Sequence, residues 1–348
     1  RFADLKSNLR IKTIRNIIGY FIDVMNVERP VGQIAIVDSI VKSDVFLSTL
    51  PKINDISQVS GGFVNHVFKV DDAEQRYFIK IRGDRFSELP EITCNPEDIK
   101  NEYLALRIFG EASPEHFPHV QSFNPAQHYL ILTDAVKEGE ILEECLVERR
   151  MSLAQVSLLG EALRRVHDSV ADRSNSIREE GDEAFYELKL LHRFGFVRHE
   201  GLERMLEELR AQKRQLILGD PAPKNIGIDQ TGEAIIFFDL EDAHQGNPIF
   251  DAGYLLAHLL LQNLTIPENS SVIYENFLEG YRADDFNRDI FKKIILGIIR
   301  YRLKGKIPYE VPSMNQEQKL KVAQRVELAL VANLENIKWE QLVQFLTS

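Results

Sequence analysis

The most informative segment of this 348-residue sequence is Gly219-Asp220-Pro221-Ala222-Pro223-Lys224-Asn225. It directly follows the short apolar run Leu216 to Leu218, and its two prolines stiffen a loop from which Asp220 can project. Asn225 can turn back beside that carboxylate. Phosphoryl transfer needs such a pair, a carboxylate that orients an attacking hydroxyl and a neutral oxygen ligand for Mg²⁺. In isolation, an aspartate that only forms a turn explains the same residues.

A second segment downstream supplies two more carboxylates. The apolar run Ile235-Ile236-Phe237-Phe238 ends in Asp239-Leu240-Glu241. Side chains at positions i and i+2 of an extended backbone lie on the same side, so we expect Asp239 and Glu241 to face one site. Mg²⁺ binds one or two carboxylates together with substrate phosphates, and this pair can supply them.

The first third of the chain contains a possible phosphate site. Val59-Ser60-Gly61-Gly62-Phe63-Val64-Asn65 separates two expected strands, and its glycines allow backbone N–H groups to approach phosphate oxygens. A plain hairpin turn explains them equally well. Lys80 interrupts the apolar strand Tyr77 to Ile81, and Glu102 lies on the core-facing stripe of an expected helix from Pro96 to Phe109. A Lys80–Glu102 pair would satisfy both charges, whereas two exposed charges are the simpler alternative.

Composition limits the class of protein. The chain has 44% hydrophobic and 27% charged residues, which is typical of a globular protein with a real core. Its net charge of -11 argues against binding to nucleic acid phosphates. It has two cysteines and no CxxC pair, and it shows neither a signal-peptide pattern nor a membrane-spanning run. We therefore expect a cytoplasmic protein without a membrane or nucleic acid partner.

The apolar patterns divide the chain into parts of different structure. Residues 1–50 are expected to form a helical extension that starts with an amphipathic helix over residues 1–26. Strands are expected at 56–60, 64–70, 76–82 and 129–133, and helices dominate from about residue 136. The predicted fold class is α+β, with a small β-rich lobe over 51–135 that contains one key helix and a larger, mostly helical lobe over 136–348.

The order of these elements resembles the aminoglycoside phosphotransferase and choline kinase-like superfamily of small-molecule kinases, and to some extent the methylthioribose kinases. A glycine turn, a strand lysine, a helix glutamate, a hinge strand, a loop with Asp and Asn, and a strand that ends in Asp follow one another as a bilobal kinase requires. Leu218-Gly219-Asp220 is similar to the His-Gly-Asp of the family's catalytic loop. The segment Phe238 to Asp251 resembles its magnesium-binding strand and the helix that follows.

The resemblance implies a role for each of these residues. Asp220 would orient the acceptor hydroxyl, Asn225 and Asp239 would bind Mg²⁺, and Glu241 would support the metal. The nucleotide ATP would contact the glycine turn, the lysine and glutamate pair, and the backbone of the hinge Leu132-Thr133-Asp134-Ala135. Asp251 would cap the next helix and brace the catalytic loop. The predicted cofactor-binding residues are Ser60, Gly61, Gly62, Lys80, Glu102 and Thr133.

Two departures from the family pattern leave an alternative open. Leu218 stands where the family has histidine, and the glycine turn lacks a GxGxxG pattern. The leading hypothesis is an ATP- and Mg²⁺-dependent kinase that phosphorylates a hydroxyl of a small molecule such as an amino sugar, amino alcohol or thiosugar. The alternatives are an inactive nucleotide-binding or scaffold protein with this fold, and transfer of AMP in place of phosphate.

The acceptor is not identified by the sequence. Arg300 and Arg302, with Lys304 and Lys306, form a basic cluster that suits an anionic or hydroxyl-rich acceptor, although a solvated helix end explains them more simply. The acidic run Glu179 to Glu183 would attract a cationic acceptor, or would only form a solvated surface. These two clusters indicate opposite substrates.

Overall fold

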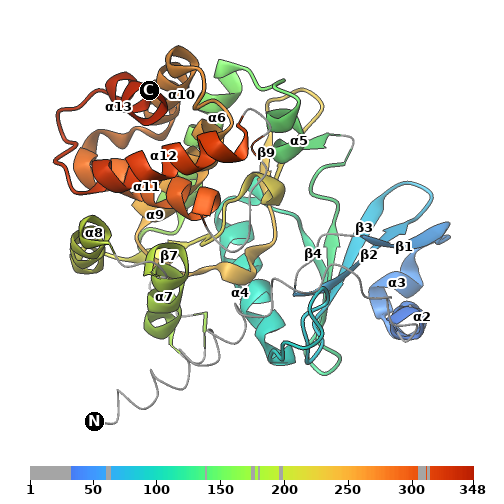
Figure 1. Cartoon of the computed structure of the whole chain (residues 1–348). Coiled ribbons are helices and arrows are strands. Elements are labelled where there is room, and N and C mark those ends of the chain that lie inside the picture. Colours follow the sequence, from blue (N-terminus) through green and yellow to red (C-terminus); the bar gives the residue numbers. More distant parts are fainter. Residues whose placement is uncertain are drawn as a thin grey trace, which may run out of the picture. The chain divides into compact units, whose positions relative to one another are not determined.

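The computed structural model describes residues 33–59, 64–137, 139–173, 177–178, 181–195, 199–304, 311 and 314–348. The expected helix over residues 1–26 and the glycine turn with Ser60, Gly61 and Gly62 lie outside these ranges. The chain divides into two compact units, unit 1 with residues 1–100 and 120–133 and unit 2 with residues 101–119 and 134–348 (Figure 1). The lobe boundaries expected at residues 50 and 135 stay a prediction.

Unit 1 is built on one antiparallel sheet. Its strands, in the order in which they lie side by side, are β1 (Asp55–Val59), β2 (His66–Asp71), β3 (Arg76–Ile81), β5 (Tyr129–Thr133) and β4 (Val120–Asn124). The Asp72 carboxylate accepts hydrogen bonds from the N–H groups of Glu74 and Gln75, which closes the turn between β2 and β3. The strands expected from the sequence are confirmed within two residues, whereas β4 was not predicted because its residues are all half-buried and show no alternation.

Two helices pack against this sheet. The apolar residues Val37 and Ile40 of α2 (Gln33–Ser43) and Leu47 of α3 (Val45–Thr49) join one buried cluster with Phe68 and Ile79 of the sheet. Asp44 lies between the two helices, where it caps α3 and accepts hydrogen bonds from Ser122 Oγ and Tyr129 Oη, both at 2.7 Å. These bonds tie the helices to β4 and β5.

Unit 2 is mostly helical, and Figure 1 shows its strands as short segments among the helices. Its helices are α4 (Ile99–Ala112), which starts at the boundary between the units, α5 (Leu142–Val147), α6 (Leu153–Ser169), α7 (Asp182–Leu190), α8 (Glu200–Ala211), α9 (Pro248–Leu261), α10 (Pro267–Tyr281), α11 (Arg288–Lys304), α12 (Gln316–Leu330) and α13 (Trp339–Thr347). Its strands are β6 (Glu140–Ile141), β8 (Ile226–Ile228) and β9 (Ile235–Phe237) in one sheet, and β7 (Gln215–Ile217) paired with β10 (His244–Gly246).

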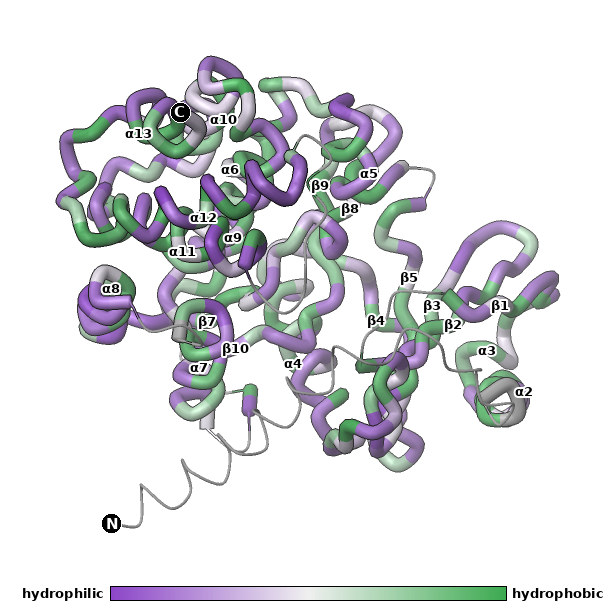
Figure 2. The backbone as a smooth tube through the Cα atoms, viewed as in Figure 1, coloured by the Kyte–Doolittle hydropathy of each residue, from purple (hydrophilic) through white to green (hydrophobic). Residues whose placement is uncertain are grey.

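The core of unit 2 surrounds α9, in which every residue from Ile249 to Leu261 is buried. Helix α11 packs on α9, and α6 and α10 approach each other closely at Gly160 and Gly280, where a Cβ atom would collide with the backbone of the facing helix. Figure 2 shows the hydrophobic residues of these helices. An α+β fold with a sheet-based unit and a larger helical unit is thus confirmed. Within the described ranges, none of the helices has both the length and the apolar character that crossing a membrane requires.

Candidate active site

The segment that follows β7 is a sharply turned loop. Gly219 has φ 80°, and a Cβ atom at this position would collide with the carbonyl oxygen of Asp242. Only glycine combines this backbone conformation with so close an approach. The loop then continues into a 3₁₀ turn, η4 (Pro223–Asn225), whose first residue is proline. Asp220 therefore lies between a tight glycine turn and a proline-stiffened turn.

A buried carboxylate from α9 holds this loop in place. Asp251, with 0% exposure, accepts hydrogen bonds from the N–H groups of Leu218 at 2.7 Å and Gly219 at 3.0 Å. The Nε2 atom of His167 lies 3.2 Å from the same carboxylate, and its Nδ1 atom lies 2.7 Å from Tyr281 Oη. The predicted bracing role of Asp251 is confirmed, and the loop is anchored through backbone N–H groups despite Leu218.

The predicted capping role of Asp251 is wrong. Helix α9 is capped by Asn247, whose side chain accepts a hydrogen bond from the Ile249 N–H group at 2.9 Å, with Pro248 at the first helical position. Asp251 lies one turn further along the helix, so its carboxylate is available to the loop.

Asn225 lies beside Asp220, as its position in the loop predicts. Its Nδ2 atom donates to the backbone oxygen of Asp220 at 3.0 Å and lies 3.4 Å from Asp220 Oδ2. The backbone oxygen of Asn225 accepts a hydrogen bond from the Phe238 N–H group at 3.0 Å. This bond extends the pairing of β8 with β9 by one residue. Asn225 therefore lies opposite Phe238, the residue that precedes Asp239.

The expected extended geometry of Asp239 and Glu241 is wrong. Strand β9 ends at Phe237, Asp239 has φ 62° and ψ 59°, and a 3₁₀ turn, η5 (Leu240–Asp242), follows at once. Aspartate tolerates this left-handed conformation better than most residues. The spacing of two therefore does not place both carboxylates on one side of a strand. Arg178 donates to the backbone oxygens of Glu241 and Ala243, which holds the turn.

Two charged residues near Asp220 were not predicted from the sequence. Arg193 belongs to a π-helical turn, η3 (Leu191–Gly195), and its Nη2 atom donates to Asp220 Oδ1 at 2.9 Å. Asp242 lies with its Oδ2 atom 4.0 Å from the same Nη2 atom and forms an ion pair with Lys189. A π-helical turn often marks a functional site.

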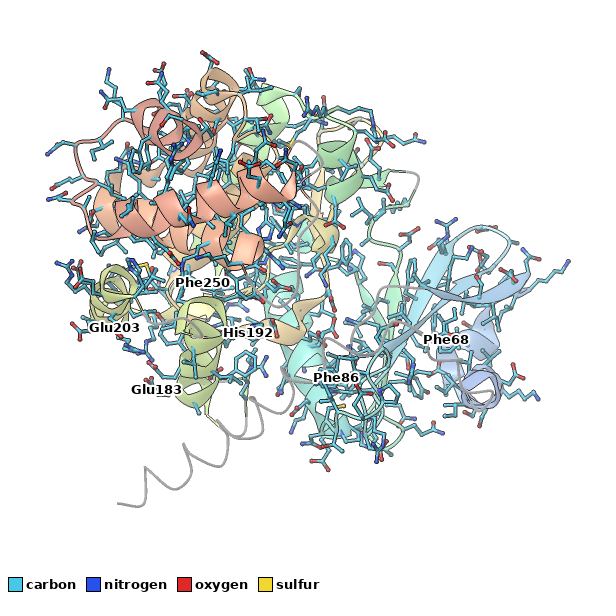
Figure 3. The ribbon with its side chains drawn as sticks, viewed as in Figure 1. Phe68, Phe86, Glu183, His192, Glu203 and Phe250 are labelled. Atoms are coloured by element: carbon cyan, nitrogen blue, oxygen red, sulfur yellow. The ribbon has the colours of Figure 1, made fainter. Side chains whose placement is uncertain are left out.

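The charges of this region fix its protonation state. Burial raises the pKa of Asp220, but Arg193 and Lys224 outweigh it, and the pKa lies well below its usual range. Burial, with help from Arg193 and Lys189, lowers the pKa of His192 to about 3. Figure 3 shows His192 among the side chains of unit 2. At neutral pH the site therefore contains an ionised Asp220 beside a cationic Arg193 and a neutral His192.

The two arginines of the basic cluster at the end of α11 are not part of a solvated helix end, which corrects the simpler interpretation for them, whereas Lys304 is exposed and Lys306 lies outside the described residues. Arg300 is 5% exposed and forms an ion pair with Glu327 at 2.9 Å. Arg302 donates to His258 Nε2 and Tyr254 Oη, both at 2.8 Å. Arg300 is buried and Arg302 is half-buried because α11 packs against both α9 and α12.

The predicted nucleotide-binding residues divide between the two units. Lys80 is buried in β3, where it pairs in register with Val67 and Leu130, and Thr133 ends β5. Glu102 is buried in α4 and belongs to unit 2. The nucleotide-binding roles of these residues stay predictions.

Comparison with protein families identifies the class of this chain. The model of the phosphotransferase enzyme family matches residues 55–290, and the chain belongs to this family. Comparison with the curated proteins finds no sequence match.

Three solved structures with a similar fold are two kinases and a protein of a kinase family. The amicoumacin kinase hAmiN, solved with AMP-PNP, Ca²⁺ and Ami, has a TM-score of 0.57 at 16% identity over 90% of this chain and 98% of its own. The choline kinase LicA from Streptococcus pneumoniae has a TM-score of 0.53 at 16% identity over 84% of this chain and 98% of its own. A choline/ethanolamine kinase family protein from Mesorhizobium loti has a TM-score of 0.51 at 16% identity over 89% of this chain and 98% of its own. The chain therefore has the kinase-like fold of these structures.

Proposed function

We propose that this protein transfers the γ-phosphate of ATP, in the presence of Mg²⁺, to a hydroxyl group of a small molecule. The observation that carries the proposal is the ionised Asp220 on a loop braced by Asp251, with Asn225 at its side. Membership of the phosphotransferase enzyme family supports it. The similar structures of an amicoumacin kinase and a choline kinase support a small-molecule acceptor.

Asp220 would bind and orient the acceptor hydroxyl. The transition state of phosphoryl transfer is loose, so that catalysis depends mostly on position and charge rather than on a strong base. A carboxylate with a lowered pKa stays ionised and accepts a hydrogen bond from the hydroxyl throughout the physiological range. The rigid loop supplies the required position, because its backbone is fixed at Leu218 and Gly219.

Asn225 and Asp239 would hold Mg²⁺, with Glu241 as an additional oxygen donor. Mg²⁺ binds one or two protein carboxylates together with substrate phosphates, which these oxygen donors can supply. The Nδ2 atom of Asn225 faces Asp220, so its amide oxygen is the atom available to a cation. Bound Mg²⁺ would neutralise the charge that develops on the phosphates.

ATP would bind through Lys80, positioned by Glu102, and through the backbone at Thr133 and at Ser60, Gly61 and Gly62. The AMP-PNP and Ca²⁺ in the structure of amicoumacin kinase support a nucleotide and a divalent cation as ligands of this fold. Cys94 and Cys145 are both thiols, which fits a reducing, cytoplasmic compartment where ATP is available.

Thermal unfolding of the wild type and of Asp239→Ala, each with ATP, Mg²⁺ or both, tests the proposal. Ligand at about 100 times its Kd adds about 2.7 kcal/mol and raises the midpoint by several degrees. We expect a Mg²⁺-dependent shift with ATP that is lost in Asp239→Ala and kept in the control Asp285→Ala, whose side chain is exposed. If the wild type shows no shift with any nucleotide, the inactive scaffold is the better description.

A further inference from the structure

We propose, on the basis of the proposed function, that the acceptor carries an anionic group, a carboxylate or a phosphate, near its reactive hydroxyl, and that Arg193 binds this group. Arg193 is 7% exposed and extends from η3 to the catalytic loop. Its Nη2 atom donates to Asp220 Oδ1 at 2.9 Å. A hydroxyl that Asp220 orients would therefore lie within a few ångströms of a buried guanidinium.

The guanidinium has unused hydrogen-bonding capacity. Within the described parts of the chain, no group accepts a hydrogen bond from the buried Nε atom of Arg193. Its Nη1 atom has one long contact, to Tyr301 Oη at 3.4 Å. Arginine has five donors in a planar fork that matches the two oxygens of a carboxylate or phosphate, and buried donors without a partner are rare in proteins. A ligand with anionic oxygens would use these donors.

Aromatic rings hold this guanidinium in place. The Cζ atom of Arg193 lies 4.8 Å from the ring centre of Tyr254 and 5.4 Å from that of Tyr301. Arg302 lies 5.8 Å from the ring centre of Tyr254 and donates to its hydroxyl at 2.8 Å. The rings restrict Arg193 to one orientation, and Arg302 adds a second positive charge to the same region.

This arrangement does not suit a cationic acceptor. Asp220 and Asp242 partly offset the charge of Arg193, but an ammonium group next to the reactive hydroxyl would compete with the guanidinium for the Asp220 carboxylate. The acceptor of a choline kinase has such a group. We therefore expect a preference for acceptors other than choline, although this chain shares a fold with a choline kinase.

A matched acceptor panel tests the inference. It contains glucose, glucosamine, glucuronate and glucose 6-phosphate, and glycerol, ethanolamine, glycerate and glycerol 3-phosphate, each with Mg²⁺ and ATP and with ADP formation measured. We expect kcat/KM for the anionic members to exceed that for the neutral member of the same scaffold at least tenfold. The cationic members are expected to be the poorest. The carboxylate and the phosphate members together show which anion is preferred.

Variants of Arg193 separate binding of the anion from support of the fold. In Arg193→Gln we expect KM for the anionic acceptors to rise about 10- to 100-fold with a smaller change in kcat, and Arg193→Lys to recover part of the loss. The control Arg165→Gln changes an exposed arginine on α6 and should leave KM unchanged. An equal loss of kcat for neutral and anionic acceptors in Arg193→Gln would show a purely structural role and overturn the inference.

The outcomes distinguish this inference from the proposed function. Preferred phosphorylation of glucosamine or ethanolamine overturns the anionic acceptor but supports the kinase. If no member is phosphorylated, the unfolding midpoints of the wild type with the same compounds show whether the anionic members bind. A rise with the anionic members that is lost in Arg193→Gln supports the inference, and no rise overturns it. A failure of the proposed function is seen separately, as the absence of any Mg²⁺-dependent shift with ATP.

Discussion

Two carboxylates of unit 2, the buried Asp251 that holds the loop after β7 and the half-buried Asp220 that belongs to this loop, have different surroundings. Asp251 has 0% exposure and is surrounded by two backbone N–H groups and His167. The Asp220 side chain is 16% exposed, and its charged partner Arg193 still has an unpartnered donor among the described residues. The first carboxylate is enclosed by protein groups, and the second has both solvent access and spare hydrogen-bonding capacity beside it.

This difference separates a structural carboxylate from a reactive one better than burial alone. A carboxylate whose oxygens are occupied by backbone N–H groups fixes the chain and cannot also bind a ligand. A carboxylate that binds a substrate from solvent needs a neighbouring residue that positions this substrate. Four changes test the comparison, from the largest expected effect to the smallest.

Asp220→Asn is expected to have the largest effect. Loss of the ionised carboxylate should reduce the rate of phosphoryl transfer about 10²- to 10⁴-fold, because the acceptor hydroxyl is no longer oriented by an anion. The unfolding midpoint should change little, since Asp242 lies 4.0 Å from Arg193 and still offsets the charge of this arginine. ADP formation and thermal unfolding measure the two effects. Unchanged turnover would remove Asp220 from the proposed mechanism.

Asp251→Ala should reduce stability and activity together. The change leaves the buried N–H groups of Leu218 and Gly219 without their acceptor, at a cost of about 3 kcal/mol. Denaturant unfolding measures the loss, and Asp168→Ala, which removes an exposed carboxylate from α6, is the control. A stable Asp251→Ala protein with normal turnover would contradict the bracing role.

His244→Gln should change how stability depends on pH. Burial, with Arg178 and Lys189, lowers the pKa of His244 to about 3, so the unfolded chain binds a proton below about pH 6.5 that the folded chain does not bind. Each such histidine should reduce stability by about 2 kcal/mol between pH 7 and pH 5. Unfolding in denaturant across this range should show a smaller decrease for His244→Gln. Parallel curves for the variant and the wild type would contradict the lowered pKa.

Tyr281→Phe should have the smallest effect. It removes the hydroxyl 2.7 Å from His167 Nδ1 and keeps the ring in its packing, so that we expect a loss of about 1 kcal/mol and a small decrease in turnover. Chemical unfolding and ADP formation measure both. A loss as large as that of Asp251→Ala would show that the brace depends on the whole chain of hydrogen bonds rather than on Asp251.

The sequence was sufficient for features that depend on neighbouring residues. Apolar periodicity and turn residues predicted β1, β2, β3 and β5 and the mostly helical structure from about residue 136, because side-chain spacing and backbone preference act over a few positions. Pro221 and Pro223 similarly indicated the stiff loop that presents Asp220 and Asn225. The order of these elements was enough to indicate the family that the comparison then confirmed.

Only the tertiary structure showed which groups meet across the fold. It showed that Asp251 holds the loop without capping the helix, and it brought Arg193 to Asp220. It also ended β9 before Asp239, which a local pattern of alternating residues did not reveal. The physical reason is the same in each case. Hydrogen bonds and ion pairs between distant segments depend on how helices pack, whereas the sequence pattern reports only the preference of each segment taken alone.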